Sequence, residues 1–329
     1  MITHPPALPD LLYLSRADVE SLDIRFTDVL DTVRQVFREK GLGQLDSPPK
    51  RGVSPSRDNS IRAMMAAIPS LSTAGVKWIS GFPSNQARGW PTITAMVVLN
   101  DVETGLPSAI LDGSWITATR TAASTLIAAQ HMARRESSSV GLIACGLQGR
   151  SNLRALCSEF PVTHVKAFDI EREAAERFAE EQRAALGVEV EVVDTATDAA
   201  REVDMLVTSL PIERRPKPPL DIDVLAPGCF AALLDYNAAM TPAGMRQADK
   251  LIVDDAAQLR WFRSVGYFRG TPEPDGDLGK VVAGRQRGRE SNEQRVIALN
   301  LGIGVLDIAT ASLIVKKARA EGRGTLLPL

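Results

Sequence analysis

The chain has 329 residues, of which 44% are hydrophobic and 24% are charged, and its 38 basic and 40 acidic residues give a net charge of -2. This composition is typical of a globular protein of roughly two domains and excludes a disordered chain. The charges are balanced, so the chain has no basic excess for nucleic acid, and no apolar run is long enough for a membrane span.

Cysteines and histidines are few, with three of each scattered along the sequence. They are too few for a disulfide framework, and they lack the spacing of a zinc site. The first residues also lack the basic and apolar regions of a secretory signal. We therefore expect a reduced, soluble, cytoplasmic protein that binds no metal.

The first third of the chain is irregular. Apolar residues at helical spacing predict a helix across 18–40 that ends at Gly41, and a Pro- and Ser-rich loop follows at 47–60. Four short strands are then predicted, separated by Gly, Pro, Asn and Asp, at 61–68, 75–80, 92–101 and 107–112. With a hairpin turn at 103–105, this pattern favours an antiparallel meander.

The rest of the chain follows a different pattern. An Ala-rich segment at 116–134 predicts a well-packed helix, and a last helix is predicted at 304–322, which we expect to pack on the first domain. Between them, helices predicted at 149–160 and 171–187 alternate with apolar strands at 140–145, 164–169, 188–194, 204–210, 229–235 and 250–255. Apolar strands separated by helices imply a parallel sheet covered on both faces.

The sharpest local motif is ACGLQG at 144–149, between a predicted strand and a predicted helix. Dinucleotide-binding units have a glycine-rich turn there, whose backbone N–H groups face a pyrophosphate. Gly146 and Gly149 match the motif, whereas Ala144 replaces its first glycine and is expected to allow the turn if its φ is negative. Asp169 ends the next strand, at the spacing expected for a ribose contact, and favours NAD over NADP. The alternative is an ordinary glycine turn beside a solvent-exposed Asp.

Four segments carry a family resemblance: GVKWISGFPSN at 75–85, TGLPSAILDGSWITATRTAA at 104–123, GLIACGLQGR at 141–150 and LGIGVLDIATA at 301–311. On these motifs the sequence resembles the ornithine cyclodeaminase/μ-crystallin family over nearly its whole length. On further shared segments it looks most like the branch that oxidatively cleaves N-(1-amino-1-carboxy-2-ethyl)glutamate to 2,3-diaminopropionate for staphyloferrin B. The segments shared with that branch are LLYLSRADVE at 11–20, CGLQG at 145–149, QADKLIVDDAAQ at 247–258 and VVAGRQRGRES at 281–291.

The resemblance implies an α/β protein with two domains. A Rossmann-type, doubly wound parallel sheet at 136–302 would bind NAD, and residues 1–135 and 303–329 would form an α+β dimerisation and substrate-binding domain. It further implies a homodimer, an active site in the cleft between the domains, and chemistry at the carbon–nitrogen bond of an amino acid. The predicted N-terminal strands are few and have polar edges, which agrees with covering by a partner subunit.

The resemblance assigns three cations to the substrate carboxylate. Lys77 stands in a predicted strand, where a Lys is ordinarily exposed, but the family pattern GxKxxxGxPxN puts it in the substrate pocket, where it could also polarise an imine. Arg120, among small residues in ITATRTAA, is implied to clamp the carboxylate, a task that suits a planar guanidinium. Arg51 matches the family's second carboxylate-binding Arg. The alternatives in this poorly aligning loop are Lys50, Arg57 and Arg62.

Asp235 ends the apolar strand at 229–235. An acid at the carboxyl end of a parallel strand points into the crevice where such sheets bind ligands. Beside Leu233 and Leu234, its pKa is expected to be raised, which helps proton transfer near neutral pH. The family uses an Asp after this strand as general acid/base, although its usual Gly-x-Asp context is replaced here. The alternative is a structural Asp in a turn.

Further cofactor contacts are expected at strand ends, in the glycine turn, at the start of the Ala-rich helix and before the last helix. The full set is Thr92, Arg120, Thr121, Gly146, Leu147, Gln148, Gly149, Asp169, Thr208, Ser209, Asn300 and Gly302.

Three functions follow from these expectations. The first is an NAD-dependent oxidoreductase acting on the C–N bond of an amino acid, its imine or an N-linked conjugate, in which Lys77, Arg51 and Arg120 hold the carboxylate. The second is a cyclodeaminase that recycles its hydride and releases ammonia without net NADH. The third is a non-catalytic binder of a small ligand, of the μ-crystallin kind. The presence of Lys77, Arg120 and Asp235 favours catalysis.

Overall fold

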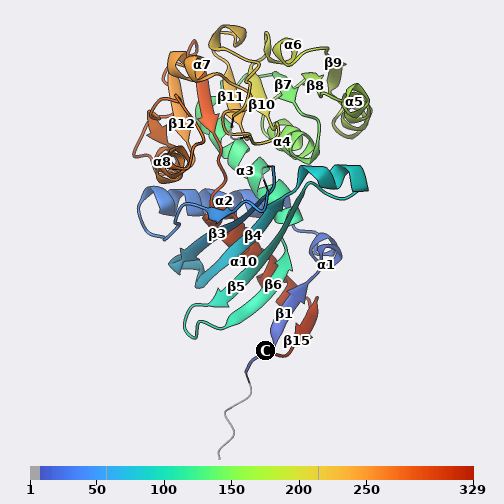
Figure 1. Cartoon of the computed structure of the whole chain (residues 1–329), viewed down its shortest axis with the longest axis vertical. Helices are drawn as coiled ribbons and strands as arrows, with labels where there is room; N and C mark the ends of the chain where they lie inside the picture. The colour runs from blue at the N-terminus through green and yellow to red at the C-terminus, as the bar shows by residue number, and fades with distance from the viewer. Residues whose placement is uncertain (1–7, 57, 214) are drawn as a thin grey trace, which may run out of the picture. The chain divides into compact units, whose positions relative to one another are not determined.

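The computed structural model describes residues 8–56, 58–213 and 215–329 (Figure 1). They form two compact units. Unit 1 comprises the residues up to Val36, Gln44–Thr117 and Ile303–Leu329, and unit 2 comprises Phe37–Gly43 and Ala118–Gly302. The units divide at residues 117 and 302, whereas the domains expected from the sequence meet at 135 and 302. Residues 118–135, which were expected in the first domain, belong to unit 2.

Unit 1 is built on a mixed sheet. Within the described part of the chain the sheet has seven strands in the order β15-β1-β6-β5-β4-β3-β2. β3 to β6 form the predicted antiparallel meander, while β1 pairs parallel with β6 and antiparallel with β15. The strands are β1 Leu11–Leu14, β2 Arg51–Val53, β3 Ser60–Ile68, β4 Thr73–Gly81, β5 Ile93–Asp101, β6 Pro107–Asp112 and β15 Thr325–Leu327. The sequence did not predict β1, β2 and β15, and β2 interrupts the predicted loop, because such short strands show too little alternation to detect.

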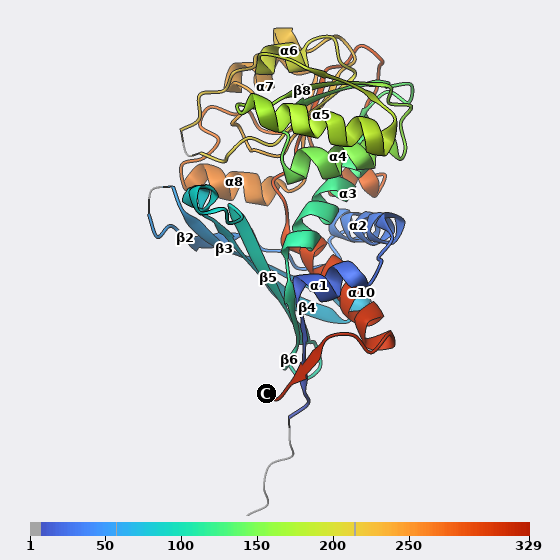
Figure 2. The same cartoon turned by 90° about the vertical axis from the view of Figure 1, so that its right-hand side faces the viewer.

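Helix α10, Gly304–Ala320, covers one face of this sheet. It packs against β3, β4 and β5, so the predicted packing of the last helix on the first part of the chain is confirmed (Figure 1, Figure 2). Alternation along the strands places Met64 and Val97 on the buried side. The helix approaches closely because Gly304 has no side chain: a Cβ there would lie 2.5 Å from the carbonyl O of Met65.

The helix predicted across 18–40 is wrong, because this segment forms two helices, α1 (Arg16–Ser21) and α2 (Phe26–Gly41). Between them, Asp23 adopts a φ of 44°, in the left-handed region that a right-handed helix excludes. Asp tolerates this conformation better than most residues. One such residue is enough to end the helix, and the apolar spacing on either side stays nearly intact. The predicted end of the second helix at Gly41 is confirmed.

Unit 2 is a parallel α/β unit, so the fold class expected from the sequence is confirmed. Across its described residues the sheet has eight strands in the order β13-β12-β14-β11-β10-β7-β8-β9, and all pairs are parallel. The strands are β7 Ser139–Ile143, β8 His164–Phe168, β9 Glu189–Val192, β10 Met205–Thr208, β11 Phe230–Leu233, β12 Lys250–Val253, β13 Gly276–Asp277 and β14 Val296–Leu299. The sequence did not predict β13 and β14, although β14 is a central strand.

Helices connect these strands, and the three predicted between 116 and 187 are confirmed with slightly shifted ends. The α-helices that accompany the sheet are α3 Ser114–Met132, α4 Leu147–Cys157, α5 Arg172–Leu186, α6 Ala196–Ala200, α7 Pro242–Gln247, α8 Ala256–Ser264 and α9 Leu278–Val282. Short 3-10 helices occur at Pro69–Leu71, Pro83–Arg88 and Ile222–Val224. The predicted stop of α5 at Gly187 is confirmed, and this glycine has a φ of 68°.

The order of the parallel sheet reverses at β7. The strands β8 and β9 extend the sheet on one side of β7, and β10, β11 and β14 extend it on the other. Open α/β sheets bind ligands outside the carboxyl ends of their strands at such a switch point. The residues that follow β7, β10, β11 and β14 are therefore placed at a potential ligand-binding edge of unit 2.

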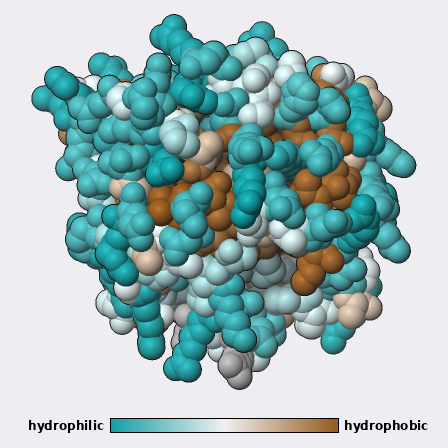
Figure 3. Space-filling model, turned by 90° about the horizontal axis from the view of Figure 1, so that it is seen from above, coloured by the Kyte–Doolittle hydropathy of each residue, from teal (hydrophilic) through white to brown (hydrophobic). Residues whose placement is uncertain are grey.

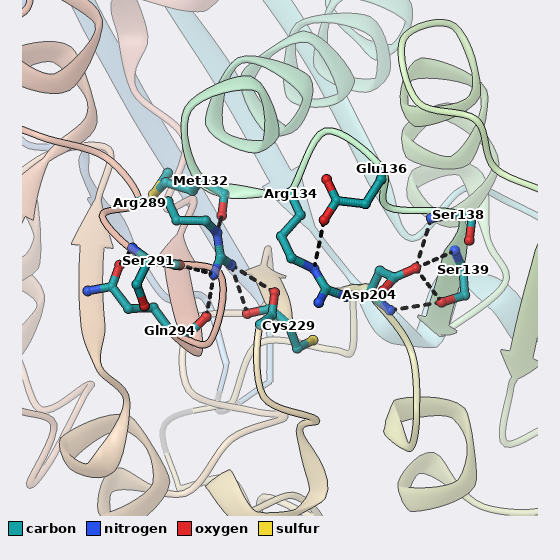
Figure 4. A network of polar contacts seen from close by, with 11 residues as sticks. Met132, Arg134, Glu136, Ser138, Ser139, Asp204, Cys229, Arg289, Ser291 and Gln294 are labelled. Carbon is teal, nitrogen blue, oxygen red and sulfur yellow. Dashed lines mark hydrogen bonds and ion pairs between the residues drawn. The ribbon is translucent and has the colours of Figure 1, made fainter.

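The amino ends of the same strands are held by a polar network (Figure 4). Asp204 precedes β10, and its Oδ2 accepts the N–H groups of Ser138 at 2.8 Å and Ser139 at 3.0 Å. The guanidinium of Arg134 pairs with the other oxygen of Asp204, and Arg289 donates to backbone carbonyls of neighbouring loops. These hydrogen bonds satisfy backbone and side-chain polar groups at the amino edge of the sheet.

The face of the molecule in Figure 3 is largely hydrophilic, with hydrophobic side chains gathered in limited areas between polar ones. None of the described helices is long and apolar enough to cross a membrane.

Candidate active site

The turn between β7 and α4 has the features of a phosphate-binding loop. Gly149 must lack a side chain, because a Cβ there would lie 2.6 Å from the carbonyl O of Ala144. Gly146 is the N-cap of α4, and its position has open space and no side-chain hydrogen bond to the helix. The first N–H groups of the helix, at Leu147 and Gln148, are thus offered to an anion at the positive end of the helix dipole.

The expectation that Ala144 has a negative φ is wrong: its φ is 77°. This left-handed conformation costs an L-residue about 1–2 kcal/mol relative to glycine. Both peptide groups of the residue are engaged, because its N–H donates to the carbonyl O of Phe168 at 2.8 Å and its carbonyl accepts the Ser209 hydroxyl at 3.4 Å. The turn therefore keeps the geometry of a glycine at this position and stores strain in the loop.

Asp169 follows β8, the strand next to β7. Its Oδ2 accepts the N–H of Cys145 at 2.8 Å, and its Oδ1 accepts the N–H of Glu171 at 3.1 Å. Each carboxylate oxygen can accept a further hydrogen bond, so a half-exposed anion is held against the glycine turn where ribose hydroxyls would be recognised. Arg172, which follows it closely in the sequence, pairs with Asp194 instead.

Polar side chains from neighbouring strands meet at the carboxyl edge of the sheet. Thr208 ends β10, Asp235 follows β11 and Asn300 follows β14, and all three are buried. Asp235 Oδ1 and Asn300 Oδ1 have no hydrogen-bond partner among the described residues. Buried polar atoms are almost always paired, so these two indicate a place where a ligand completes the hydrogen bonding.

Asp235 has the electrostatics of a proton-transfer group. Its side chain is almost fully buried, and burial raises its pKa from 3.8 to about 6, although the N–H of Leu210 donates to Oδ2 at 3.0 Å. A carboxyl group with this pKa exchanges protons close to neutral pH. The pKa direction predicted from the sequence is therefore correct.

The residue after Asp235 is also unusual. Tyr236 has a φ of 65°, which is rare for an aromatic residue, and it is buried. Its ring centroid lies 4.9 Å from that of Phe262 and 5.2 Å from that of Phe268. This aromatic packing holds the strained turn that follows the carboxylate.

Arg120, on α3, lies beside the segment that follows β14. Gly302 in this segment has a φ of 76°, and a Cβ there would lie 3.0 Å from Nη1 of Arg120. Oδ2 of Asp254 accepts the N–H of Gly302 at 2.6 Å, and Nε2 of Gln258 donates to its carbonyl O at 2.8 Å. Asp254 and Gln258 were not predicted from the sequence, because their partner lies more than forty residues further along the chain.

The same segment is tied to α3 by a second contact, in which Nδ2 of Asn300 donates to Oγ1 of Thr125 at 3.3 Å. Thr121, one turn before Thr125, is buried. Unit 2 therefore brings the predicted contacts together in two groups. One surrounds the glycine turn with Asp169 and Ser209, and the other joins α3 to the segment after β14.

In unit 1, Lys77 is fully buried on β4, where the sequence alone favoured exposure. Its Nζ donates to Oδ1 of Asp307, on α10, at 2.5 Å and to Oγ1 of Thr117 at 3.2 Å. The side chains of Lys77 and Asp307 are both 0% exposed. Asp307 was not predicted from the sequence either, because 230 positions separate it from its partner.

The cations of the neighbouring loop lie on different faces of the unit 1 sheet. Arg51 is exposed and lies opposite Ala63, on the face that carries Trp78. Because successive strand residues point to opposite faces, Arg62 lies on the other face, and so does Lys77. The structure thus places Arg62, rather than Arg51, on the same face as Lys77.

Of the other residues predicted in the first part of the chain, the structure describes Lys50 and Thr92. Lys50 is buried, and Arg57 lies outside the described residues. Thr92 is half-buried just before β5, and its carbonyl O accepts the N–H of Phe82 at 2.8 Å. In the described ranges, no group of His, Cys, Asp and Glu side chains is arranged to hold a metal ion.

Comparison with known proteins gives matches over almost the whole chain. The model of the "Ornithine cyclodeaminase/mu-crystallin family" matches residues 11–322. The chain is 31% identical to an alanine dehydrogenase of Archaeoglobus fulgidus, over 96% of this chain and 98% of the relative. It is 26% identical to the N-((2S)-2-amino-2-carboxyethyl)-L-glutamate dehydrogenase of Staphylococcus aureus, over 97% and 99% of the two chains.

Solved structures match equally far. The Δ(1)-pyrroline-2-carboxylate reductase of Thermococcus litoralis, in complex with NADH and L-proline, has a TM-score of 0.86 and 28% identity over 96% of this chain and 100% of that chain. An archaeal alanine dehydrogenase dimer with bound NAD has a TM-score of 0.86 and 30% identity over 97% and 99% of the two chains.

Proposed function

Because the chain belongs to the ornithine cyclodeaminase/mu-crystallin family, we propose that it is an NAD-dependent oxidoreductase acting on the C–N bond of an amino acid, its imine or an N-linked amino acid conjugate. The observation that carries the proposal is Asp235, a buried carboxyl at the ligand-binding edge of a parallel sheet, with a pKa of about 6 and one unpaired oxygen. Relatives similar over their full length are a dehydrogenase of alanine and a reductase solved with NADH and L-proline.

The residues of unit 2 fit a nicotinamide dinucleotide. The N–H groups at the start of α4 would hold its pyrophosphate, Asp169 its adenosine ribose, and the unpaired Oδ1 of Asn300 would face its nicotinamide end. NAD supplies a hydride acceptor for the α-carbon of the substrate, and NADH supplies the donor for the reverse reaction. The carboxylate of Asp169 disfavours the 2′-phosphate of NADP.

Lys77 and Arg120 are assigned to the substrate carboxylate, as the family resemblance implies. An ammonium and a guanidinium make charge-assisted hydrogen bonds worth about 1.5–3 kcal/mol each, which selects an anionic substrate. Arg51 stays a prediction as the third cation, and its face on the sheet makes Arg62 the stronger candidate.

Asp235 is assigned the proton transfer. As a carboxylate it removes the proton from the substrate nitrogen when the C–N bond is oxidised, and as a carboxylic acid it protonates the imine nitrogen in the reverse direction. Its raised pKa lets both forms exist close to neutral pH. The same group can activate the water that hydrolyses an imine, which releases ammonia or, from an N-linked conjugate, an amine.

The similarity to the Staphylococcus aureus dehydrogenase supports a conjugate of two amino acids as one substrate class. The cytoplasmic location expected from the composition stays a prediction.

The reaction is tested by mixing the protein with NAD and a panel that contains L-alanine, L-proline, L-ornithine and N-((2S)-2-amino-2-carboxyethyl)-L-glutamate. NADH absorbance and released ammonia or amine are followed together. Formation of NADH by one member of the panel is the expected result. Ammonia without NADH would indicate a cyclodeaminase instead, and binding without any product would indicate a ligand-binding protein.

We propose that the protein is a homodimer through the outer face of the unit 1 sheet, the face that carries Met65, Trp78 and Met96. These side chains are 41%, 49% and 47% exposed, and the pairing of β3, β4 and β5 places them side by side. An exposed apolar sheet face of this kind is typical of an interaction surface. A similar archaeal alanine dehydrogenase is a dimer, which supports a second copy as the occupant.

Light scattering after size-exclusion chromatography tests this arrangement at micromolar concentration. The unmodified chain is expected to have the mass of a dimer, and Met96→Glu that of a monomer. Ile170→Glu is the matched control, because Ile170 is an 89% exposed apolar residue of unit 2. A monomeric unmodified chain, or a dimer that persists in Met96→Glu, would contradict this interface.

A further inference from the structure

We infer that Asp307 is a positioning residue that fixes the ammonium of Lys77 in one direction, so that Lys77 acts as a fixed cation and not as an amine nucleophile. This inference rests on the proposed function, in which Lys77 binds the substrate carboxylate. It adds a residue of the last helix to the machinery, at a position that the motifs of the sequence leave without a role.

The geometry joins three elements of the chain. Lys77 Nζ, from β4, lies 2.5 Å from Oδ1 of Asp307 on α10 and 3.2 Å from Oγ1 of Thr117 in the first turn of α3. The Thr117 hydroxyl in turn donates to the carbonyl O of Gly113 at 2.7 Å, so its oxygen accepts from Lys77. Asp307 and Thr117, on two different helices, therefore fix where the ammonium of Lys77 lies and how it is oriented.

The apolar surroundings of Lys77 and Asp307 do not require an ion pair for packing. Lys77 lies between Met64 and Val97 in the sheet register, and both neighbours are buried apolar residues. A buried ion pair can often be replaced by well-packed apolar residues of similar volume without loss of stability. An ammonium kept on an apolar sheet face, with a carboxylate supplied by another element, therefore points to a use for the charge.

The pair also restricts the chemistry of Lys77. Nζ of Lys77 is held as a hydrogen-bond donor to the Asp307 carboxylate and to the Thr117 hydroxyl, and an ammonium held in this way has no lone pair with which to attack a carbonyl carbon. Lys77 therefore contributes a directed positive charge to a carboxylate or to a polarised imine. Proton transfer is left to Asp235, whose own partner is the N–H of Leu210.

The test is a double-mutant cycle with Asp307→Asn, Lys77→Ala and the combination, assayed with the amino acid that the panel identifies. Asp307→Asn is expected to lower kcat/KM about 100-fold, the loss typical of a displaced binding group, mainly by raising KM. In the Lys77→Ala background the same change is expected to have less than about a threefold effect, because the residues act as one unit. The affinity for NADH, measured by fluorescence titration, is expected to stay unchanged.

The matched control is Asp204→Asn, which removes the carboxylate of another ion pair, with Arg134 at the amino edge of the sheet. It is expected to lower stability and leave kcat/KM within about twofold, since it is remote from the chemistry. If Asp307→Asn is insoluble but Lys77→Ala/Asp307→Asn folds, the partner of Asp307 is Lys77, as inferred. If both are insoluble, Asp307 serves the packing of α10 and the inference is overturned.

The outcomes separate this inference from the function on which it rests. Unchanged kcat/KM in Lys77→Ala would remove Lys77 from substrate binding and overturn this inference, while the NAD-dependent turnover itself would leave the proposed reaction standing. A large loss in Lys77→Ala, with an equal effect of Asp307→Asn in both backgrounds, would overturn the positioning role and leave the proposed function standing.

Discussion

Replacing Asp235 by Asn is expected to stabilise the protein while it abolishes turnover. Burial raises the pKa of Asp235 from 3.8 to about 6, so the folded protein binds this proton more tightly than the unfolded chain does. The contribution of this proton to the free energy of unfolding is fully present below pH 3.8, and it is lost as the pH rises through about 6. At pH 7 the ionised carboxyl therefore destabilises the folded state.

The magnitude follows from the two pKa values. Their difference corresponds to about 3 kcal/mol at pH 7, because each pH unit between them is worth about 1.4 kcal/mol. At pH 5 the folded group is mostly protonated, and the same relation leaves about 2 kcal/mol. Asn keeps an acceptor for the N–H of Leu210 and cannot ionise, so Asp235→Asn should recover most of this free energy.

Urea unfolding at pH 7 and pH 5, without cofactor or substrate, measures the effect. Asp204→Asn is a control with the opposite sign. Burial alone would raise the pKa of Asp204, but hydrogen bonds from Ser138, Ser139 and Arg134 lower it, so its neutralisation costs stability at pH 7. If Asp235→Asn is no more stable than the unmodified chain at pH 7, or if its gain is the same at both pH values, the burial argument is refuted.

Three further predictions follow from single contacts. Ala144→Gly relaxes a φ of 77° and should leave the free energy of unfolding unchanged or raise it by up to about 1 kcal/mol in a urea titration. Its control is Ala184→Gly, on the exposed face of α5, which should lower the free energy of unfolding by about 1 kcal/mol. Asp169→Ser should raise the ratio of NADP to NAD turnover in initial-rate assays, and a tenfold preference of the unmodified enzyme for NADP would contradict the role of Asp169. Gly302→Ala would place a Cβ 3.0 Å from Arg120 and should lower kcat/KM about 100-fold, and near-normal activity would show that this contact is not needed.

The parallel sheet of unit 2 was predictable because most of its strands are continuous apolar runs between helices. The exceptions are β13, Gly276–Asp277, which has only two residues, and β14, Val296–Leu299, which comes after a long polar segment. The paired helices α1 and α2 show a second limit. A single residue at positive φ, Asp23, breaks a helix without disturbing the apolar spacing around it.

The same distinction holds for the candidate site. Gly146, Asp169 and Asp235 were found because each stands at the end of a predicted strand, a property of neighbouring residues. Asp307 was not found, because an Asp within an apolar helix has no local sign of a partner on β4. Arg51 was predicted from its match to a family position, but residue type does not reveal the face of the edge strand β2 on which its side chain lies.

The central claim is that a hydride passes between the α-carbon of an amino acid and the nicotinamide, with net production of NADH. It is tested most directly with the active amino acid carrying deuterium at its α-carbon. The proposed function predicts that the NADH formed contains one deuterium and that kcat/KM shows a primary isotope effect. NADH without deuterium, or ammonia released with no net NADH, would contradict it.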